Sequence, residues 1–562
     1  MHLQEVNPEP IQWQHQSGSG EQTLEKYIDQ DNNINCSIKS NSRNIIENKP
    51  CNIEDKIGSN NSNNSANCND IILDYNKEDD YVNSFLPITC YSILIAIGGL
   101  VFGYDIGTIG GIVDLPAFNM TYGNNETTNP HSFTPIVKGS IVSISSLGGF
   151  FSGLIAVSII PIIGMRFTIF TSMLLYILGN FIILISNKWE LILLGRSLNG
   201  TCIGLITITC PMYISEITPL KHRGLFTCFH QLFTTIGIVV GALTILYSSS
   251  SYFDTDVSQY EYPLIQGMIL AFINACIIWI VPESPNWLVK KDKPIHKVKK
   301  SLSKIRNLSI DNEDITNSTA KLFDMNFQMN NIHTMKKQNS NSIIKGKPKY
   351  FQRTITGILL LGFQQFTGIN YFFYYGITIF ENIKLTTPYL VPVIFGVVNL
   401  LCSCLSIYII SIFNRKVLLI AGSFCMVVLM AIFTSIEVFV KVDFIISIIL
   451  IIVSCLFISC FSLTWGPISS VLVSEMYPTN IKVKAMSICG SSCWIFNFII
   501  ALMIPILSSK IGFSLGYIFV GFLTISIPFT YYLVPETRNK STARLDRIYE
   551  TNKSKWGIVL QN

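Results

Sequence analysis

The stretch FQQFTGINYFFYYG carries three amide side chains, Gln364, Gln365 and Asn370, in a segment that is otherwise apolar and uncharged. Amides donate and accept hydrogen bonds without carrying charge, which suits a neutral ligand covered in hydroxyl groups. An unpaired amide in hydrocarbon costs on the order of several kcal/mol, so these side chains are expected to face a bundle interior or a cavity. This chemistry favours a sugar over an ion or an amino acid, with packing between helices as the alternative for any single amide.

The three amides cannot share one face of a straight helix, because successive residues are turned by about 100°. Thr367-Gly368 lies between them and offers a place for a break, since glycine tolerates a distorted backbone. A discontinuous helix at the middle of the membrane is how carriers of small molecules expose binding groups. Gln231 and Asn399, in two other apolar segments, add to the same set of amides.

The composition indicates a membrane protein. Hydrophobic residues make up 49% of the 562 residues and charged residues 13%, where a globular chain has about 25% charged residues. Apolar windows of about 20 residues can cross a hydrocarbon core of roughly 30 Å as helices. We predict an all-α membrane protein with twelve transmembrane helices in two six-helix halves. The helices are expected near residues 85–109, 136–160, 167–186, 190–213, 225–248, 263–281, 354–380, 388–411, 417–438, 443–470, 484–508 and 514–534.

The remaining sequence suggests two kinds of connecting segment. An N-terminal tail rich in Asn, Ser and acidic residues has too few large apolar side chains to fold. A lysine-rich loop between the sixth and seventh spans is spaced for one or two short amphipathic helices. We interpret it as a solvated basic linker, with contact to the membrane surface as the alternative. The expected parts are a disordered tail over 1–80, six-helix halves over 81–281 and 354–534, the basic loop over 282–353 and a short C-terminal tail over 535–562.

Charges in the short loops predict the orientation of the chain. Basic residues gather on one side of the membrane, namely Arg166, Lys221, His222, Arg223, Arg415, Lys416, Lys482 and Lys484. The opposite loops carry acidic residues, namely Asp114, Glu126, Asp254, Asp256 and Glu261. By the positive-inside rule both termini are cytoplasmic, and we expect a multi-pass protein of the plasma membrane. The sequons at Asn119 and Asn125 then lie in the first outer loop, where a glycan could attach.

Two sequence patterns occur once in each half. Ser215-Glu216-x-x-Pro219-x-x-x-Arg223 follows the fourth span, and Ser474-Glu475-x-x-Pro478-x-x-x-Lys482 follows the tenth. Pro282-Glu283-Ser284 closes the sixth span, and Pro535-Glu536-Thr537 closes the twelfth. This repetition indicates two halves in the same orientation, an arrangement associated with alternating-access carriers that hold a central site between the halves.

Taken together, these residues resemble the sugar porters of the major facilitator superfamily, and most closely the fungal hexose transporters. The resemblance runs from about Phe85 to Tyr549. It rests on the motifs GYDIGTIGGIV, GRSLNGTCIGL, PMYISEITPLKHRG, HQL, PESPNWL, QQFTGINYFFYYGITIF, FGVVN, TWGPI, SEMYPTNIKVKAMSI and VPETRN. It implies the major facilitator fold and transport of a hexose by alternating access, with glucose as the expected sugar.

The resemblance also implies roles for individual residues. In the family, aromatic faces in the sugar cavity stack on the C–H surface of the ring. The positions that line this cavity match Gln231, Gln364, Gln365, Asn370, Asn399, Trp494 and Asn497. We expect the outer gate near Tyr374 and Tyr375. The charges that tie the halves together on the cytoplasmic side when the carrier faces outward match Glu216, Arg223, Glu283, Glu475, Lys482 and Glu536. Ordinary surface pairing is the alternative for these charges.

Several positions depart from the family pattern. The loop motif D-x-x-G-R-R is altered in both halves, at Pro161, Met165, Ser411, Asn414 and Lys416. Asn286 replaces the arginine of the PESPRW motif. Ser470 stands where the family commonly has a tryptophan or tyrosine near the sugar, so an aromatic platform for the ring is missing there.

Asp105 and Arg196 are the only charges that we place deep within the spans, at similar depth, where they could form a pair. Such a pair occupies matching positions in proton-coupled sugar porters and can couple proton flow to sugar movement. Fungal hexose facilitators, by resemblance, also carry this aspartate. Proton symport and facilitated diffusion therefore both remain open, and we favour diffusion.

Two other classes of function were weighed. A transporter-like glucose sensor would share the membrane core, but the sensors of the family carry a long C-terminal extension, and 28 residues follow Val534 here. An enzyme or an ATP-driven pump is not supported, because the sequence has no GxxxxGK[ST], HExxH or GxSxG motif. We expect no cofactor, no metal site and no nucleic-acid partner. The expected partners are a sugar substrate and the lipid bilayer.

Overall fold

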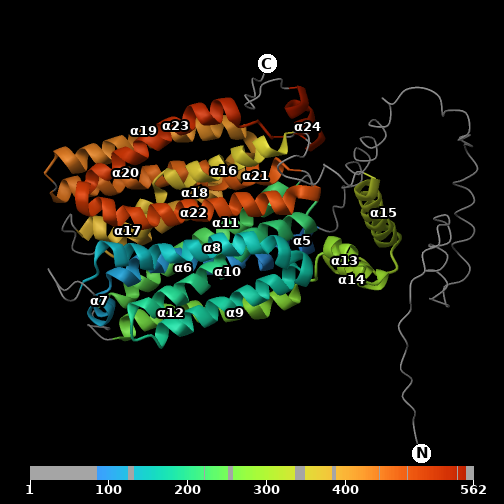
Figure 1. Cartoon of the computed structure of the whole chain (residues 1–562), viewed down its shortest axis with the longest axis horizontal. Coiled ribbons are helices and arrows are strands. Elements are labelled where there is room, and N and C mark those ends of the chain that lie inside the picture. The colour runs from blue at the N-terminus through green and yellow to red at the C-terminus, as the bar shows by residue number, and fades with distance from the viewer. Residues whose placement is uncertain are drawn as a thin grey trace, which may run out of the picture. The chain divides into compact units, whose positions relative to one another are not determined.

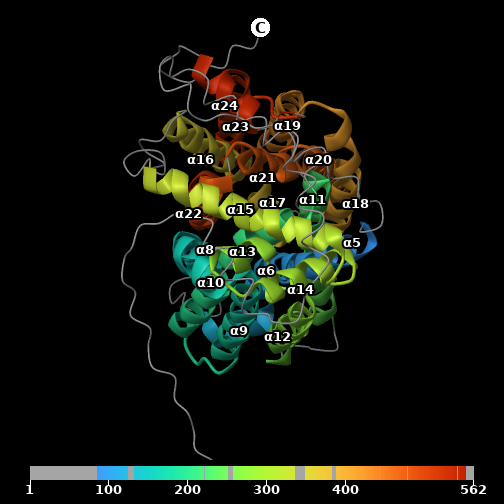
Figure 2. The ribbon, with the colours of Figure 1, turned by 90° about the vertical axis from the view of Figure 1, so that its right-hand side faces the viewer.

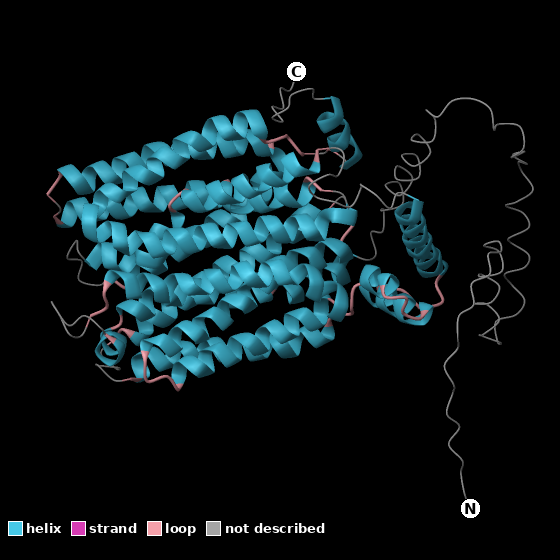
Figure 3. Cartoon of the chain, in the orientation of Figure 1, coloured by secondary structure: helices cyan, strands magenta, loops and turns pink. Residues whose placement is uncertain are grey.

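The computed structural model describes residues 85–123, 132–219, 222–250, 257–335, 349–381, 388–441, 443–477, 479–538, 540 and 542–551. They belong to one compact unit of the chain, Leu73–Asn562. The expected N-terminal tail lies outside the described residues. Every regular element of the described residues is a helix, and none of them forms a strand (Figure 3).

The helices follow one another with short connections. The first half contains α5 (Phe85–Ala96), α6 (Gly98–Asp114), α7 (Pro116–Tyr122), α8 (Pro135–Ile163), α9 (Met165–Leu184), α10 (Trp189–Ile217), α11 (Arg223–Ser248), α12 (Ser258–Ile277) and the 3-10 turn η3 (Ile278–Ile280). Between the halves lie α13 (Pro285–Lys290), α14 (Ile295–Arg306) and α15 (Glu313–Met335). The second half contains α16 (Tyr350–Phe366), α17 (Ile369–Glu381), α18 (Leu390–Ile412), α19 (Arg415–Phe439), α20 (Phe444–Leu463), α21 (Trp465–Glu475), α22 (Thr479–Ile511), η4 (Gly512–Leu515) and α23 (Gly516–Leu533), and α24 (Thr542–Thr551) follows it.

Ten helical segments of the described residues are long and apolar enough to cross a membrane. One of these segments, Lys484–Leu533, crosses twice, because η4 separates α22 from α23. The broken pair α16 and α17 provides one further crossing. The described helices therefore account for the twelve predicted spans, and each predicted range contains a helix.

The two halves pack against each other along two pairs of helices, α8 with α22 and α11 with α18. In Figure 1 the helices of the first half, coloured blue to green, lie beside those of the second half, coloured yellow to red. Glycines on α8 allow close approach, since a Cβ atom at Gly149 would lie 2.8 Å from the ring of Trp494. The interface is therefore formed by residues far apart in the sequence.

Three of the spans are interrupted. The predicted break between α16 and α17 is confirmed at Thr367-Gly368, where Gly368 has φ +88° and the ring of Phe519 fills the space that a side chain would need. The first span is interrupted at Ile97. A third break, which the sequence analysis did not predict, lies at Thr464, between α20 and α21.

The helix bundle has two distinct ends, which we name after the helices found there. The α7 end carries α7 and the last turns of α6, α17 and α19. The α13 end carries α13, α14 and α15 and is viewed directly in Figure 2. The segment between the halves holds three helices, where one or two were expected, and buried side chains such as Val298 and Leu302 pack α14 onto its neighbours.

Candidate functional site

A cluster of amides joins the broken span α16–α17 to α22. The side-chain oxygen of Gln365 accepts a hydrogen bond from Nδ2 of Asn370 at 2.8 Å, across the break. Nε2 of Gln365 donates to Sγ of Cys493 at 3.1 Å. One helical turn further along α22, Nδ2 of Asn497 donates to the hydroxyl of Tyr374 at 3.3 Å, while the buried Oδ1 atom of Asn497 has no partner among the described residues. The break thus brings Gln365, Asn370, Asn497 and Tyr374 together, as a binding site for a neutral polar ligand requires.

Trp494 extends this cluster to the other half of the bundle. It lies beside Cys493 on α22, and its ring packs against Phe102 of α6 with centroids 5.6 Å apart at an interplanar angle of 68°. Gly149 of α8 provides the space for the indole. The amide cluster therefore sits at the interface between the halves, with an aromatic face beside it.

Three of the predicted sugar-binding amides are not hydrogen-bonded to the cluster. Nε2 of Gln364 donates to the carbonyl oxygens of Trp465 and Gly466 at 3.1 and 2.9 Å, and so stabilises the break between α20 and α21. Oδ1 of Asn399 accepts from the hydroxyl of Ser462 at 2.6 Å. The half-buried amide of Gln231 makes no hydrogen bond to any residue that the structure describes, so it can bind a ligand without breaking an existing bond.

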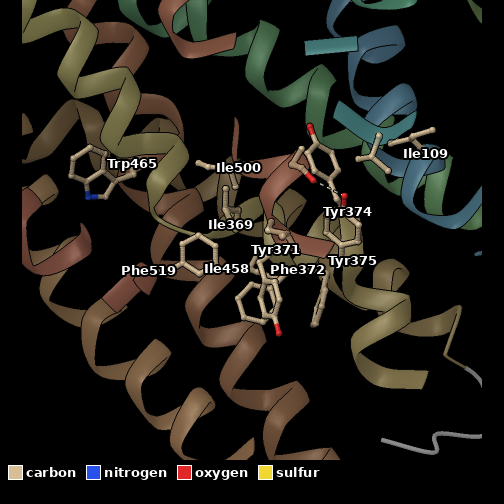
Figure 4. Close-up of a cluster of buried hydrophobic side chains, with 14 of the residues drawn as sticks. Ile109, Ile369, Tyr371, Phe372, Tyr374, Tyr375, Ile458, Trp465, Ile500 and Phe519 are labelled. Atoms are coloured by element: carbon tan, nitrogen blue, oxygen red, sulfur yellow. Dashed lines mark hydrogen bonds between the residues drawn. The ribbon is translucent and has the colours of Figure 1, made fainter. Parts of the chain in front are cut away.

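The α7 end of the site is closed by contacts between the halves. Tyr374 and Tyr375 are buried, and within the second half the hydroxyl of Tyr375 donates to the carbonyl oxygen of Ala501 at 2.7 Å. Gly110 of α6 lies against the backbone of α17, where an added Cβ atom would be 2.5 Å from the carbonyl oxygen of Tyr374. Figure 4 shows the two tyrosines on α17 beside Ile109 of α6. The role of the two tyrosines as the outer gate stays a prediction.

A second contact between the halves at this end lies outside the predicted gate. The hydroxyl of Tyr389 donates to the carbonyl oxygen of Asp114 at 3.1 Å. We expect Tyr389→Phe to weaken closure by about 0.5–1.5 kcal/mol, the net contribution of one hydrogen bond. The measurement is the labelling of Cys493 by a membrane-impermeant thiol reagent added to intact cells and read by mass spectrometry, which should become faster in the variant.

Tyr408→Phe is the matched control for this prediction, because Tyr408 lies on α18 with its side chain exposed on the surface of the bundle. It should leave the labelling rate unchanged. Equal rates in Tyr389→Phe and in the wild type would show that the Tyr389 hydrogen bond does not hold the gate.

Toward the α13 end, the site has an exposed polar residue, Ser470. Ser470 is exposed, although its neighbours on α21 from Trp465 to Val473 are buried. Its hydroxyl donates to the carbonyl oxygen of Pro467 at 3.0 Å. An exposed polar residue within a span normally faces an aqueous cavity rather than lipid. We therefore expect an aqueous passage toward the α13 end beside Ser470.

Asp105 and Arg196 form the buried ion pair that their depth predicts. Nη1 of Arg196 lies 2.6 Å from Oδ1 of Asp105, and both residues are about 95% buried, with exposures of 5% and 4%. Oδ1 of Asp105 also accepts from the hydroxyl of Tyr176 at 3.3 Å, and Nη2 of Arg196 donates to Oγ of Ser145 at 3.2 Å. The partners Tyr176 and Ser145 were not predicted, because a hydroxyl in a span gives no signal of what it binds.

A cavity of about 20 Å³ adjoins this ion pair, which is room for one water molecule. Its polar lining includes Asp105, Tyr176, Asn180 and Arg196, and all of its lining residues belong to the first half. The side chains that contact the ion pair therefore belong to the first half, and no hydrogen bond of the described residues joins the pair to the amide cluster.

The repeated carboxylates at the α13 end make equivalent contacts in the two halves. Glu283 accepts from the backbone N–H groups of Met165 and Arg166 at 3.1 and 3.4 Å, and so caps the start of α9. Glu536 accepts from those of Arg415 and Lys416 at 3.3 and 3.0 Å, at the start of α19. Because helix N-termini present free N–H groups, such caps explain the repeated Pro-Glu motif.

A second carboxylate in each half completes the pattern. Glu216 accepts a hydrogen bond from Oγ of Ser284, and Glu475 accepts from Oγ1 of Thr537 at 2.5 Å. Glu475 also forms an ion pair with Arg415 at 3.0 Å. These contacts lie within one half each. Since the bundle is closed at the α7 end, the ties between halves that the resemblance implies for the outward-facing state remain a proposal.

Burial raises the pKa of Glu283 above its usual value, although backbone donors from Ser284, Arg166 and Met165 act in the opposite direction. The neutral form is thus favoured more in the folded protein than in the unfolded chain. This contribution to stability is present at low pH and is lost as the pH rises.

The side chain of Arg223, another charge expected at this end, lies outside the described residues.

Asn119 is a poor candidate for glycosylation. Its Nδ2 atom, which would carry the glycan, donates to the carbonyl oxygens of Val113 and Leu115 at 3.1 and 3.2 Å. These bonds fix α7 to the end of α6. The other predicted acceptor, Asn125, lies outside the described residues.

Two further charged residues are buried near the ends of spans, although Asp105 and Arg196 lie deeper within theirs. Arg353 is fully buried, because α16 begins at Tyr350 and α24 covers it. Its guanidinium pairs with Asp546 at 2.7 Å and lies 4.2 Å from the ring centre of Tyr549. Glu437 is buried near the end of α19 with 8% exposure. In the sequence, the indication of Glu437 is a single acidic residue in the last turn of a predicted span.

Twelve membrane-spanning helices in two halves, with a broken helix and an uncharged polar cluster at their interface, define a secondary transporter of the major facilitator type. Residues 91–549 match the family model described as "Sugar (and other) transporter". The chain belongs to this family of multi-pass membrane transporters.

Curated relatives agree with this assignment. The hexose transporter HXT14 of Saccharomyces cerevisiae is 34% identical over 474 residues, which cover 82% of this chain and 88% of that protein. A low-affinity glucose transporter of Kluyveromyces lactis is 32% identical over 489 residues, which cover 84% of each chain. Among solved structures, the inward open xylose transporter XylE of Escherichia coli superposes with a TM-score of 0.65 at 23% identity, covering 82% of this chain and 99% of that one. This last similarity supports the fold.

Proposed function

We propose that the protein transports a hexose, with glucose as the first candidate, by alternating access. The observation that carries this proposal is the amide cluster of Gln365, Asn370 and Asn497 at the break of α16–α17, which is uncharged and lies against Trp494 at the interface between the halves. Amides match sugar hydroxyls as donors and acceptors, and an indole face matches the C–H surface of the ring. The hexose and glucose transporters among the relatives support this choice of substrate.

The mechanism follows from the two ends of the site. A hexose enters from the α7 end, where Tyr374 and Tyr375 separate from α6, and the amides replace its hydrogen bonds to water. Closure of the gate around Gly110 then brings the bundle to the conformation described here, and the passage beside Ser470 releases the sugar. Better contact with the sugar in the closed state supplies the free energy for this change. The charge clusters of Glu216, Arg223, Glu475 and Lys482 hold the α13 end together when the carrier faces outward.

Facilitated diffusion is the mode that we propose. Asp105 is paired with Arg196 inside the first half. Sugar uptake is measured at several external pH values, with and without an uncoupler. Diffusion predicts that, at each pH, the initial rate is the same with and without the uncoupler.

Proton-coupled symport is the second candidate, because Asp105 adjoins a cavity with room for one water molecule. If a proton reaches Asp105 through this cavity, it breaks the pair with Arg196 and favours a different conformation of the first half. Uptake that collapses with the uncoupler would select symport over diffusion.

A substitution at Ser470 can distinguish a transporter-like glucose sensor from a carrier. The exposed position of Ser470 at the passage leaves room for a larger side chain, so we expect Ser470→Trp to add an aromatic face beside the sugar. The affinity should tighten by about 1 kcal/mol, which is roughly fivefold. The measurement is uptake at low sugar concentration in yeast that lacks its own hexose transporters.

In a carrier, Ser470→Trp raises uptake at low sugar, and the wild type moves sugar above the empty-vector control. In a sensor, the same change alters signalling while flux stays at background. Surface expression of both chains is checked on the same cells. If the wild type and Ser470→Trp both show only background flux over a panel of hexoses and pentoses, the sensor hypothesis would replace the carrier hypothesis.

We also propose that the protein lies in the plasma membrane with both termini in the cytoplasm. The exposed lysines of the α13 end, among them Lys290, Lys291 and Lys300, support this orientation through the positive-inside rule. The α7 end then faces outward. Asn125 is the acceptor that we propose for a glycan, since the amide of Asn119 is already engaged.

A further inference from the structure

One buried carboxyl group, that of Glu437, takes no part in the site described above. It lies in the last turn of α19, two residues before the helix ends, and so about 3 Å from the α7 end of that span. Both of its carboxyl oxygens are buried, and neither has a hydrogen-bond partner among the residues that the structure describes. Thr434, one turn earlier on the same helix, also has a buried hydroxyl that meets no partner in the described part of the chain. Within that part, three unpartnered polar atoms thus gather within one turn of α19.

An ionised carboxylate is not stable in such surroundings. Burying a charge without a partner is far more costly than burying a neutral polar group, so the carboxyl group takes up a proton. Asp105 provides the contrast within the same chain, because Arg196 lies 2.6 Å from its carboxylate. We propose that Glu437 is a proton-binding site, loaded from the solution at the α7 end, and that its proton keeps the last turn of α19 packed against the gate helix α17.

The packing of α19 links this site to the gate. Phe433, one turn before Glu437, meets Phe372 of α17 with ring centroids 5.1 Å apart. Tyr371 lies within electrostatic range of the Glu437 carboxyl group and also packs against Phe519, at 6.0 Å. In Figure 4, Tyr371, Phe372 and Phe519 lie close together on the far side of α17 from Ile109. Since Tyr371 and Phe372 precede the gate tyrosines by one turn, a charge on Glu437 acts directly behind the gate.

The neighbouring titratable groups do not offset that charge. Among the described residues, none forms an ion pair with Glu437. Titratable side chains on the elements packed around this turn, or on the turns next to them, are Tyr371 of α17, Tyr517 of α23, Lys441 and Asp443 before α20, and Lys510 of α22. The two lysines and Asp443 are exposed, and the hydroxyl of Tyr517 is bound to Ser435 at 2.9 Å. Loss of the proton therefore leaves an unpaired charge.

The direct test is infrared spectroscopy of the full chain in lipid nanodiscs at neutral pH. The wild type should show the C=O absorption of a protonated carboxyl group, and Glu437→Gln should lose it. Glutamine has nearly the same shape and no charge, so the variant should fold. Glu190→Gln is the matched control, because Glu190 is an exposed carboxylate at the same end, and it should keep the band. Identical spectra of the wild type and Glu437→Gln would overturn the proposal.

The consequence for the gate is tested by sugar uptake, and this part rests on the proposed function. Ionisation of Glu437 in alkaline medium should loosen the packing behind α17, so wild-type uptake should fall as the external pH rises. Glu437→Gln, which stays neutral, should lose this part of the pH dependence. The same pH profile in the wild type and in Glu437→Gln would show that Glu437 does not act on the gate. If neither chain moves sugar, the proposed function fails, while the infrared comparison still decides whether Glu437 holds a proton.

Discussion

Replacing Arg196 by leucine is expected to destabilise the protein by about 3–5 kcal/mol, because it leaves the carboxylate of Asp105 buried without its partner. The pair lies 2.6 Å apart, and the remaining partner of the carboxylate would be the hydroxyl of Tyr176. A neutral hydroxyl does not replace a guanidinium in offsetting a buried charge. The measurement is the midpoint of thermal unfolding in detergent. It is read from the fraction of protein that stays monodisperse after heating.

The double variant Asp105→Asn/Arg196→Leu is the control for this prediction. It removes both charges, so it should regain most of the stability that the single Arg196→Leu variant loses. A single variant that unfolds within about 0.5 kcal/mol of the wild type, as an ordinary surface substitution does, would contradict the account. Water would then have to reach Asp105 in the folded protein.

Gln365→Leu is expected to weaken sugar binding by about 1–3 kcal/mol, which corresponds to roughly 5- to 150-fold in affinity. The substitution removes the amide that joins Asn370 to Cys493, and it leaves ligand hydroxyls unpaired in a buried site. Leucine suits a membrane span, so insertion and surface expression should be unaffected. The measurement is the dependence of initial uptake on sugar concentration.

Gln266→Leu provides a matched amide for this comparison. Gln266 is half-buried on α12, and its side-chain oxygen accepts from Oγ1 of Thr244 within the first half, away from the interface. Its replacement should leave the affinity for sugar unchanged. If Gln365→Leu and the wild type take up sugar equally at low concentration, the amide of Gln365 serves helix packing alone.

The sequence predicts the spans and one of their breaks because both depend on local properties. Hydropathy over about 20 residues locates a span, and Gly368 at φ +88° is a conformation that glycine adopts readily. The break at Thr464 has weaker signals, Gly466 and Pro467, which lie beyond it in the chain. The structure shows it by the backbone of Thr464, and Gln364 binds the carbonyl oxygens that follow it.

The partners of the polar side chains could not be predicted, since they depend on how helices turn against each other. Gln364 and Gln365 are adjacent in sequence, yet one binds the break before α21 and the other binds Asn370 and Cys493. The repeated glutamates Glu283 and Glu536 cap α9 and α19 here, and their part in joining the halves of the outward-facing carrier stays a prediction. A repeat in the sequence shows that two positions are equivalent, but it does not identify what they contact.

The central claim is that the chain carries a hexose by alternating access, and counterflow of labelled glucose tests it most directly. Yeast that lacks its own hexose transporters and expresses this chain is loaded with unlabelled glucose and then given a trace of label outside. A carrier exchanges the two, so the account predicts that label accumulates transiently above its external concentration, with no proton gradient required. Label that stays at the level of the empty-vector control, in cells with confirmed surface expression, would contradict the account.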